Sequence, residues 1–135
     1  MKTLILQLMT QQSYVYDMYT QIINEEYAKK HQYTYVATEH VDVPKNGTYK
    51  LNLIKQHLLH YDRIMYLDSH VFFNNFDITL DQFNETEHFG VCKNGQNGGH
   101  LLNTGVLLLY NTSIMRQMLD IWLYNLSEYT AQHIN

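Results

Sequence analysis

Short apolar segments alternate along the chain with longer segments whose apolar residues recur every three to four positions. Lys2–Met9 is apolar and rich in β-formers, which predicts a buried first strand. A helix is predicted from Ser13, a candidate N-cap, to about His31. Its apolar positions at helical spacing are Val15, Met18, Ile22, Ile23 and Tyr27. The remaining predicted elements are strands at Tyr33–Ala37, Arg63–Leu67, Val71–Phe73, His88–Cys92 and Leu102–Tyr110, a helix at Tyr49–Tyr61, a turn or short helix at Leu80–Asn84, and a helix from Ile114 to about Leu126 capped by Thr112.

The order strand, helix, strand, helix, strand is typical of a parallel sheet with right-handed crossovers. We therefore predict the α/β class, with a mostly parallel, Rossmann-like sheet flanked by helices. A length of 135 residues predicts one domain, spanning residues 1–135. Ligands of such sheets bind at the carboxyl ends of the strands, so functional residues are expected there.

Composition excludes several classes of protein. Hydrophobic residues make up 45% of the chain, which argues against disorder. The net charge is −4 and no basic tract occurs, so a nucleic-acid partner is not expected. One cysteine rules out an internal disulfide. No apolar run has the length of a membrane span and no signal peptide is recognised, so we expect a cytoplasmic protein. The 12 tyrosines and single proline fit an A/T-rich genome, as in some viruses, which would place the protein in host cytoplasm.

Asp68 and His70 are the first candidates for chemistry. The apolar strand Arg63–Leu67 delivers both residues to its carboxyl end. In an extended chain, residues two apart point to the same side, so a carboxylate and an imidazole would meet one divalent metal ion. Oxygen and nitrogen ligands suit Mn²⁺, with Mg²⁺ as the alternative. The competing interpretation is that Asp68 caps a turn and that His70 is a surface histidine.

The segment Tyr61–His70 resembles the metal-binding signature of nucleotide-sugar glycosyltransferases with the GT-A fold. That signature is Asp-x-Asp after an apolar strand. The Tyr-Asp and Tyr-Leu-Asp elements match, and His70 takes the place of the second Asp. The polypeptide N-acetylgalactosaminyltransferases carry Asp-x-His at this point. The resemblance implies a short GT-A-like domain in which Asp68 and His70 bind Mn²⁺ or Mg²⁺ and Ser69 lies at the donor.

Three further segments resemble galactosyl- and mannosyltransferases in the same order along the chain. They are Asn24–Tyr35, Tyr49–Lys55 and Leu102–Leu109. The resemblance implies that the residues that bind the donor include Lys50, Asp68, Ser69, Asn103, Thr104 and Gly105. The alternatives are that Lys50 is a solvated helix residue, that Asn103 satisfies a backbone group, and that Gly105 relieves packing.

The loop after the first strand holds the base in members of this family, partly by aromatic stacking. The resemblance therefore implies that Thr10, Tyr14 and Tyr16 contact the nucleotide base. The alternative for the two tyrosines is packing of the helix. His100 and His133 are candidates for a further metal ligand, whereas Cys92 is expected in the core.

The resemblance implies metal-dependent transfer of a sugar from a nucleotide-diphosphate donor, usually a UDP-sugar, to a glycan or protein acceptor. No catalytic base is assigned, and the resemblance favours a retaining reaction. A second hypothesis is a non-catalytic nucleotide- or glycan-binding module of the same fold, completed by a partner or a second copy of the chain. An unrelated α/β function, such as a response-regulator-like domain, lacks the acidic cluster that it needs.

Overall fold

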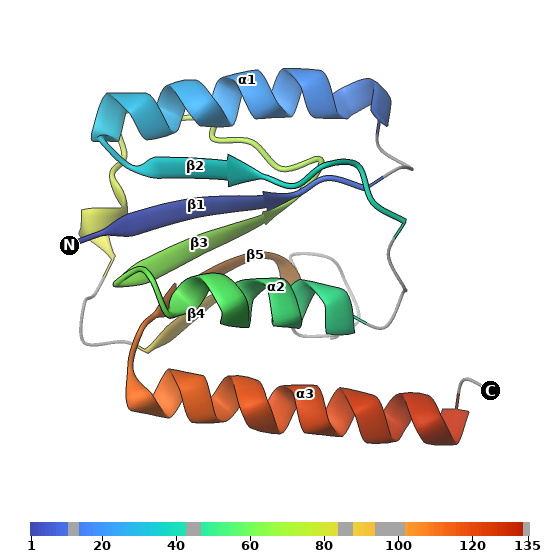
Figure 1. Cartoon of the computed structure of the whole chain (residues 1–135). Helices are drawn as coiled ribbons and strands as arrows, with labels where there is room; N and C mark the ends of the chain where they lie inside the picture. Colours follow the sequence, from blue (N-terminus) through green and yellow to red (C-terminus); the bar gives the residue numbers. More distant parts are fainter. Residues whose placement is uncertain (11–13, 43–46, 84–87, 94–101, 134–135) are drawn as a thin grey trace.

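A five-stranded sheet forms the centre of the computed structural model, which describes residues 1–10, 14–42, 47–83, 88–93 and 102–133 (Figure 1). The strands are β1 (Thr3–Leu8), β2 (Thr34–Ala37), β3 (Arg63–Asp68), β4 (Phe89–Lys93) and β5 (Leu102–Tyr110). The helices are α1 (Tyr14–His31), α2 (Thr48–Leu58) and α3 (Ser113–His133), with a 3₁₀ turn, η2, at Leu80–Gln82. This architecture confirms the predicted α/β class.

The strands lie in the order β2-β1-β3-β5-β4. β1 is parallel to both of its neighbours and places Ile5 beside Tyr35 on one side and Met65 on the other. β5 is antiparallel to both β3 and β4, so it runs against the other four strands of the sheet. Only residues 94–101 separate β4 from β5, fewer than the dozen or so that a parallel crossover needs. The sheet is therefore mostly parallel, as predicted.

The elements follow the predicted positions with a few differences, and α2 ends at Leu58, before the expected Tyr61. Thr112 caps α3 as expected, because its Oγ1 accepts a hydrogen bond from the Met115 amide at 3.1 Å. The helix continues to His133, beyond the expected end near Leu126. The predicted short strand at Val71–Phe73 is wrong, since this segment is irregular. None of the described helices combines the length and hydropathy that crossing a bilayer requires.

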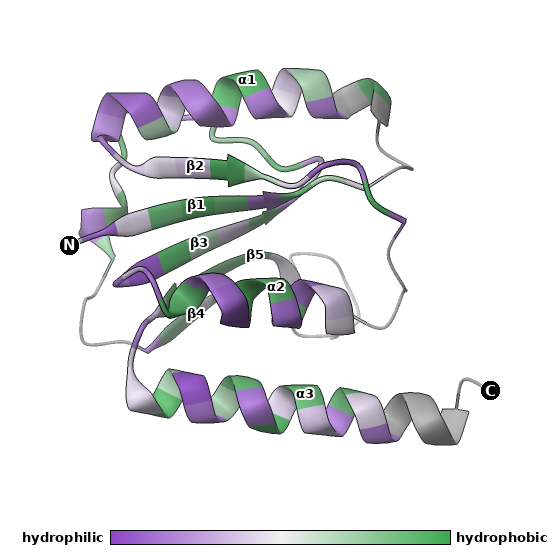
Figure 2. Cartoon of the chain, viewed as in Figure 1, coloured by the Kyte–Doolittle hydropathy of each residue, from purple (hydrophilic) through white to green (hydrophobic). Residues whose placement is uncertain are grey.

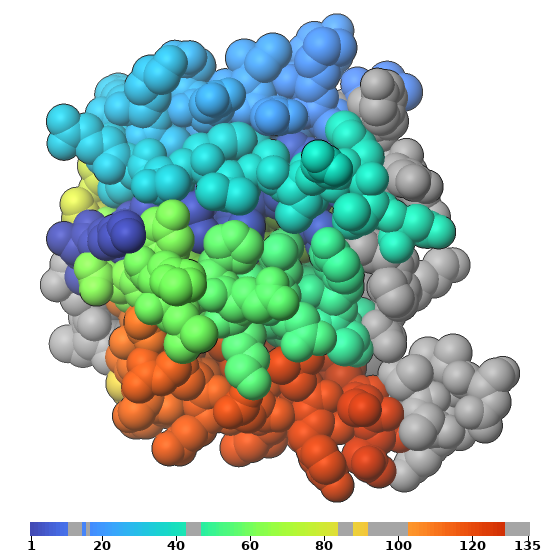
Figure 3. Space-filling view, viewed as in Figure 1, coloured from blue at the N-terminus to red at the C-terminus, as the bar shows by residue number. Residues whose placement is uncertain are grey.

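Two apolar layers lie on opposite faces of the sheet. One face packs against α2 and α3, whose buried residues are Leu51, Ile54, Leu58, Met115 and Leu119. The other face packs against α1 and η2 through Tyr27, Ala28 and Leu80. In the space-filling view, α1, the β2 region, α2 and α3 form successive bands across the visible side of the molecule (Figure 3). Both faces of the central strands are therefore covered, as an apolar strand such as β1 requires.

The first half of α1 turns a polar side toward the sheet, contrary to the predicted apolar stripe. Three positions of that stripe are exposed: Val15 by 74%, Met18 by 62% and Ile22 by 57%. The buried residues in this stretch are Asp17, Thr20 and Asn24. Figure 2 shows hydrophilic and hydrophobic bands mixed along α1, whereas the middle of β1 is hydrophobic. A buried polar helix face requires hydrogen-bond partners, and these lie next to the candidate site.

Candidate functional site

Asp68 is the last residue of β3 and lies at the carboxyl end of the central parallel strands. Its side chain is 31% exposed. The hydroxyl of the fully buried Tyr66, two residues earlier on the same face, donates a hydrogen bond to Asp68 Oδ1 at 2.6 Å. Burial raises the pKa of Tyr66, and the neighbouring Asp68 carboxylate raises it further. The phenol therefore stays protonated and holds one carboxylate oxygen in a fixed direction.

Lys50 reaches this carboxylate from α2. Its Nζ lies 3.3 Å from Asp68 Oδ1, and the side chain is 16% exposed. The same ammonium group donates to the carbonyl oxygen of Thr104 at 2.9 Å and to Thr104 Oγ1 at 3.3 Å. It also lies 4.8 Å from the centre of the Tyr66 ring. The structure thus brings together Lys50, Asp68 and Thr104, and the alternative of a solvated lysine is wrong.

Asn103 and Gly105 complete this cluster from β5. The Asn103 Oδ1 accepts a hydrogen bond from the Gly105 amide at 2.8 Å, which bears out the structural alternative for this side chain. A β-carbon placed on Gly105 would lie 3.0 Å from Asn103 Oδ1 and 3.2 Å from Asp68 Oδ2. Glycine at this position therefore lets β5 approach the Asp68 carboxylate. Within the described residues, Asp68 Oδ2 accepts no hydrogen bond.

Ser69 and His70 lie in a turn, not in an extended segment. The strand ends at Asp68, and the Val71 amide donates to the Asp68 carbonyl at 3.1 Å. The assumption that the chain stays extended through His70 is therefore wrong, because a tight turn begins immediately after the strand. Ser69 is buried, whereas the His70 side chain is exposed.

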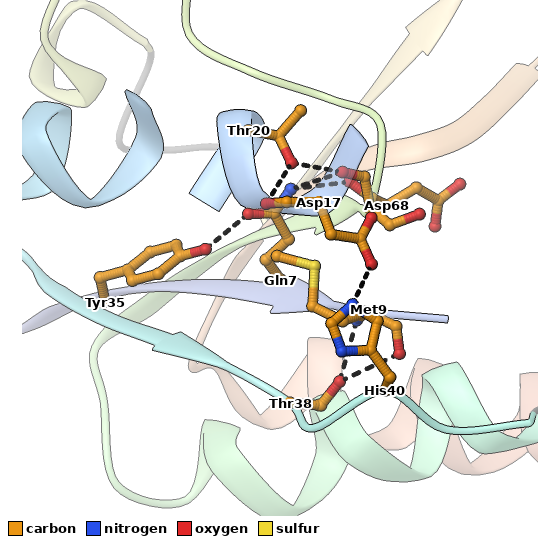
Figure 4. A network of polar contacts seen from close by, with 9 residues as sticks. Gln7, Met9, Asp17, Thr20, Tyr35, Thr38, His40 and Asp68 are labelled. Carbon is orange, nitrogen blue, oxygen red and sulfur yellow. Dashed lines mark hydrogen bonds and ion pairs between the residues drawn. The ribbon is translucent and has the colours of Figure 1, made fainter. Parts of the chain in front are cut away.

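A buried polar network behind this turn was not predicted from the sequence. Gln7, near the end of the apolar strand β1, is fully buried, and its two amide protons are shared among three carbonyl groups between Asp68 and Val71. Asn24 and Thr20 of α1 donate to carbonyls of the same segment. Figure 4 shows Gln7, Thr20 and Asp68 in this network. A glutamine inside an apolar strand was the sequence signal that could have revealed it.

The segment after β1 is held against the segment after β2. Thr10 forms an isolated parallel bridge with Val41, and the Val41 amide donates to the Met9 carbonyl at 3.2 Å. Asp17 of α1 lies 2.5 Å from His40 Nε2 and is 1% exposed (Figure 4). Thr10 therefore lies at the carboxyl edge of the parallel strands, where the predicted base-binding loop begins.

Several predicted residues lie partly or wholly outside the described part of the chain. Tyr14 and Tyr16 belong to α1, but their side chains fall outside the description. Cys92 belongs to β4, and its side chain is likewise outside it. His100 is outside the described residues, and His133 ends α3.

The described part of the chain contains no group of three or more His, Cys, Asp or Glu side chains arranged to hold a metal ion. Asp68 and His70 therefore form at most a two-residue donor set in these segments. A carboxylate oxygen and an imidazole nitrogen are donor types that divalent cations accept, together with ligands from a substrate or from water.

Comparison with known proteins places this fold among glycosyltransferases. No family model matches the sequence, and no curated protein matches it. Among solved structures the chain is similar to two glycosyltransferases. The similarity at 14–16% identity concerns the fold, which is glycosyltransferase-like.

One of these structures is a glycosyltransferase involved in the glycosylation of the major capsid of PBCV-1. It superposes with a TM-score of 0.70 at 16% identity over 92% of this chain. The other is the apo form of the glycosyltransferase GlyE of Streptococcus pneumoniae TIGR4, with a TM-score of 0.59, 14% identity and 100% of this chain covered. The match covers 66% of the first protein and 40% of the second, so this chain spans less than two thirds of either.

Proposed function

We propose that this chain is the donor-binding domain of a metal-dependent glycosyltransferase that uses a nucleotide-diphosphate sugar. The observation that carries the proposal is the cluster of Asp68, Lys50, Asn103, Thr104 and Gly105 at the carboxyl end of β3. The side chains come from three elements, α2, β3 and β5, in a fold that is glycosyltransferase-like. Ligands of open α/β sheets bind at this edge, which supports a donor site here.

Asp68 Oδ2 and the His70 imidazole are the proposed ligands of Mn²⁺ or Mg²⁺. Asp68 Oδ1 is occupied by Tyr66 and Lys50, whereas Oδ2 lies toward the backbone of Gly105 and accepts no hydrogen bond from the described residues. A bound divalent cation supplies Lewis-acid neutralisation of the charge on a diphosphate leaving group. His70 must be neutral to act as a ligand, so we expect metal binding to weaken below about pH 6.

Lys50 is the proposed electrostatic partner of the donor diphosphate. Its ammonium group is nearly buried and is oriented by Thr104 and Asp68, so it presents a positive charge in a fixed place. A preorganised charge stabilises negative charge that develops on a leaving group more than a mobile one does. Binding of a diphosphate would transfer one of its hydrogen bonds from protein to phosphate oxygen.

The remaining donor contacts are assigned by position. Asn103 is exposed beside Asp68, and its amide nitrogen is the group proposed to orient the sugar. Thr10 lies where the first strand ends, and Tyr14 and Tyr16 follow at the start of α1, so these three are the proposed base contacts, with uracil as the expected base. The proposed acceptor is a glycan or a protein, and no residue is assigned as catalytic base.

A second candidate function is donor or glycan binding without turnover. The observation that favours it is the length of the match, since this chain covers only 66% and 40% of the lengths of the two glycosyltransferase structures. In this case a partner or a second copy would complete the site. The two functions differ in whether bound donor is hydrolysed or transferred.

Calorimetric titration with UDP and GDP, each with and without Mn²⁺, tests the proposal. We expect Mn²⁺-dependent binding of UDP that Asp68→Ala and His70→Ala abolish. Matched controls are Asp120→Ala, which removes an exposed carboxylate of α3, and His60→Ala, which removes an exposed histidine. Binding that survives Asp68→Ala, or the same loss in the control variants, would contradict the proposed site. Hydrolysis of UDP-sugars by the wild-type chain then separates the enzyme from the binding module.

A further inference from the structure

We propose that Gln7 is a positioning residue whose buried amide fixes the turn that presents Asp68 and His70 to the donor. The inference rests on the proposed function, because it assigns a role within that site. Gln7 does not contact the donor in this proposal. It acts through the backbone of the segment 68–71.

The surroundings of Gln7 are unusual for a polar side chain. β1 reads Thr-Leu-Ile-Leu-Gln-Leu, all six residues are buried, and Gln7 is 0% exposed. An amide in such a place is costly unless all of its polar atoms are paired. The reason for its presence must therefore lie in its hydrogen bonds.

The amide nitrogen of Gln7 faces the turn that follows β3. Nε2 lies 3.1 Å from the Asp68 carbonyl oxygen, 3.2 Å from that of Ser69 and 3.1 Å from that of Val71. These three carbonyl groups belong to the segment that begins with the proposed metal ligand Asp68 and contains His70. One side chain from β1 thus contacts three backbone carbonyl groups of this turn.

The amide oxygen of Gln7 is also hydrogen-bonded. Oε1 accepts hydrogen bonds from Asn24 Nδ2 at 3.0 Å and from the Tyr35 hydroxyl at 2.6 Å. Burial raises the pKa of Tyr35, so this hydroxyl remains a donor. Helix α1 and strand β2 therefore both fix the orientation of the amide, which points Nε2 at the turn.

Each of these three carbonyl groups has a second donor, so Gln7 is not needed to satisfy them. The Asp68 carbonyl accepts from the Val71 amide at 3.1 Å, and the Ser69 carbonyl accepts from Thr20 Oγ1 at 2.7 Å. The Val71 carbonyl accepts from Asn24 Nδ2 at 2.8 Å. The three carbonyl groups therefore stay paired when the Gln7 amide is lost, and the turn gains freedom to move. The cost to stability comes from the Tyr35 hydroxyl, which loses its acceptor.

A polar group behind a metal ligand commonly sets its orientation. Loss of such an outer partner lowers metal affinity by about 10- to 100-fold. The Gln7 amide is placed to have this effect on Asp68 and His70 together, because it bonds the backbone on both sides of Ser69. Its contribution should appear in metal-dependent binding more than in overall stability.

The test compares Gln7→Met with Ile5→Val, a conservative change on the same face of β1. Gln7→Met keeps the length of the side chain and removes its polar atoms. Hydrogen exchange of the Val71 and Phe73 amides is measured without ligand, and UDP binding is then measured in the presence of Mn²⁺. We expect Gln7→Met to speed exchange at these two amides by about tenfold relative to amides of β5. We expect the dissociation constant to rise about 10- to 100-fold, with neither effect in Ile5→Val.

Unchanged local exchange, or unchanged UDP affinity, in a folded Gln7→Met variant would overturn the role of Gln7. If that variant does not fold, Tyr35→Phe replaces it, since this change removes a single hydrogen bond to Oε1. It should produce a smaller change at the same two amides, and equal exchange would overturn the role. Absence of UDP binding by the wild-type chain would instead overturn the proposed function, and with it the place of Gln7 in the donor site, whatever the exchange rates.

Discussion

Replacing Gly105 with alanine tests how closely β5 must approach the Asp68 carboxylate. The added β-carbon would lie 3.0 Å from Asn103 Oδ1 and 3.2 Å from Asp68 Oδ2, both closer than ordinary van der Waals contact. Asn103 Oδ1 is held in place by the Gly105 amide at 2.8 Å, and Tyr66 and Lys50 hold the Asp68 carboxylate. Neither neighbour can therefore move without weakening a hydrogen bond.

The magnitude follows from two opposing effects. Overpacking of this kind costs about 1–3 kcal/mol. Alanine also reduces the conformational entropy of the unfolded chain, which stabilises the folded state by roughly 0.4–1 kcal/mol. We therefore expect Gly105→Ala to lower the free energy of unfolding by about 1–2 kcal/mol. Because the new methyl group faces Oδ2, Mn²⁺-dependent binding of UDP should weaken as well.

Gly90 of the neighbouring strand β4 provides the matched control. A β-carbon there would lie 3.5 Å from Leu108 Cβ and 3.9 Å from the Leu108 carbonyl oxygen, which are ordinary contacts. Gly90→Ala should therefore leave stability unchanged or raise it by up to about 1 kcal/mol. Urea unfolding of both variants measures the difference. Equal stability of the two alanine variants, or full UDP affinity in Gly105→Ala, would refute the close approach of β5 to Asp68.

Three further predictions concern the scaffold. Burial, and then the neighbouring Tyr33, raise the pKa of Tyr27 from 10.0 to about 12. The neutral phenol therefore contributes stability that is complete below pH 10 and is lost as the pH rises toward 12. Tyr27→Phe should reduce this loss of unfolding free energy at high pH by roughly 2–3 kcal/mol, as measured by urea unfolding at several pH values. Thr112→Ala should cost about 1 kcal/mol in thermal or urea unfolding because the N-cap of α3 is lost, whereas Thr112→Ser should cost almost nothing. Asp81→Ala should cost about 1–2 kcal/mol, since it leaves the buried Arg63 guanidinium without its carboxylate, and Asp81→Asn should cost less; equal values for the two variants would contradict this.

The sequence predicted the position of Asp68, because a polar residue that closes an apolar strand of a parallel sheet lies at the edge where ligands bind. Asp68 closes an apolar strand, and Lys50 and Thr104 lie on elements that end or begin at the same edge of the sheet. The position of Asp68 at the carboxyl edge of the sheet followed from the order of the elements, whereas Lys50 and Thr104 were expected there from the resemblance to known glycosyltransferases. The same resemblance added Asn103 and Gly105.

The polar interior of the molecule escaped prediction because helical periodicity weighs apolar residues alone. Of the five apolar positions at helical spacing in α1, Val15, Met18 and Ile22 are exposed and Tyr27 is buried. Thr20 and Asn24 are buried instead, because the turn after β3 offers carbonyl groups that need donors. A tertiary requirement of this kind leaves little trace in the local pattern.

The turn at Ser69 and His70 was mistaken for a continuing strand for a related reason. Val71–Phe73 is rich in β-formers, which predicts an extended segment. The backbone of this segment forms hydrogen bonds with the side chains of Gln7 and Asn24, and no strand of the described residues pairs with it. Hydrogen bonds to side chains far away in the sequence therefore determine the conformation of this segment more than its β propensity does.

Paramagnetic broadening by Mn²⁺ in the presence of UDP tests the central claim most directly. Mn²⁺ broadens NMR signals of nearby nuclei, so the amide spectrum reports where the cation binds. We predict selective loss of the signals of Asp68, Ser69, His70 and Gly105 at substoichiometric Mn²⁺, with the signals of Gly90 and Met115 retained, and no such loss in Asp68→Ala. Broadening centred elsewhere, or an identical pattern in Asp68→Ala, would contradict a metal-dependent donor site at the end of β3.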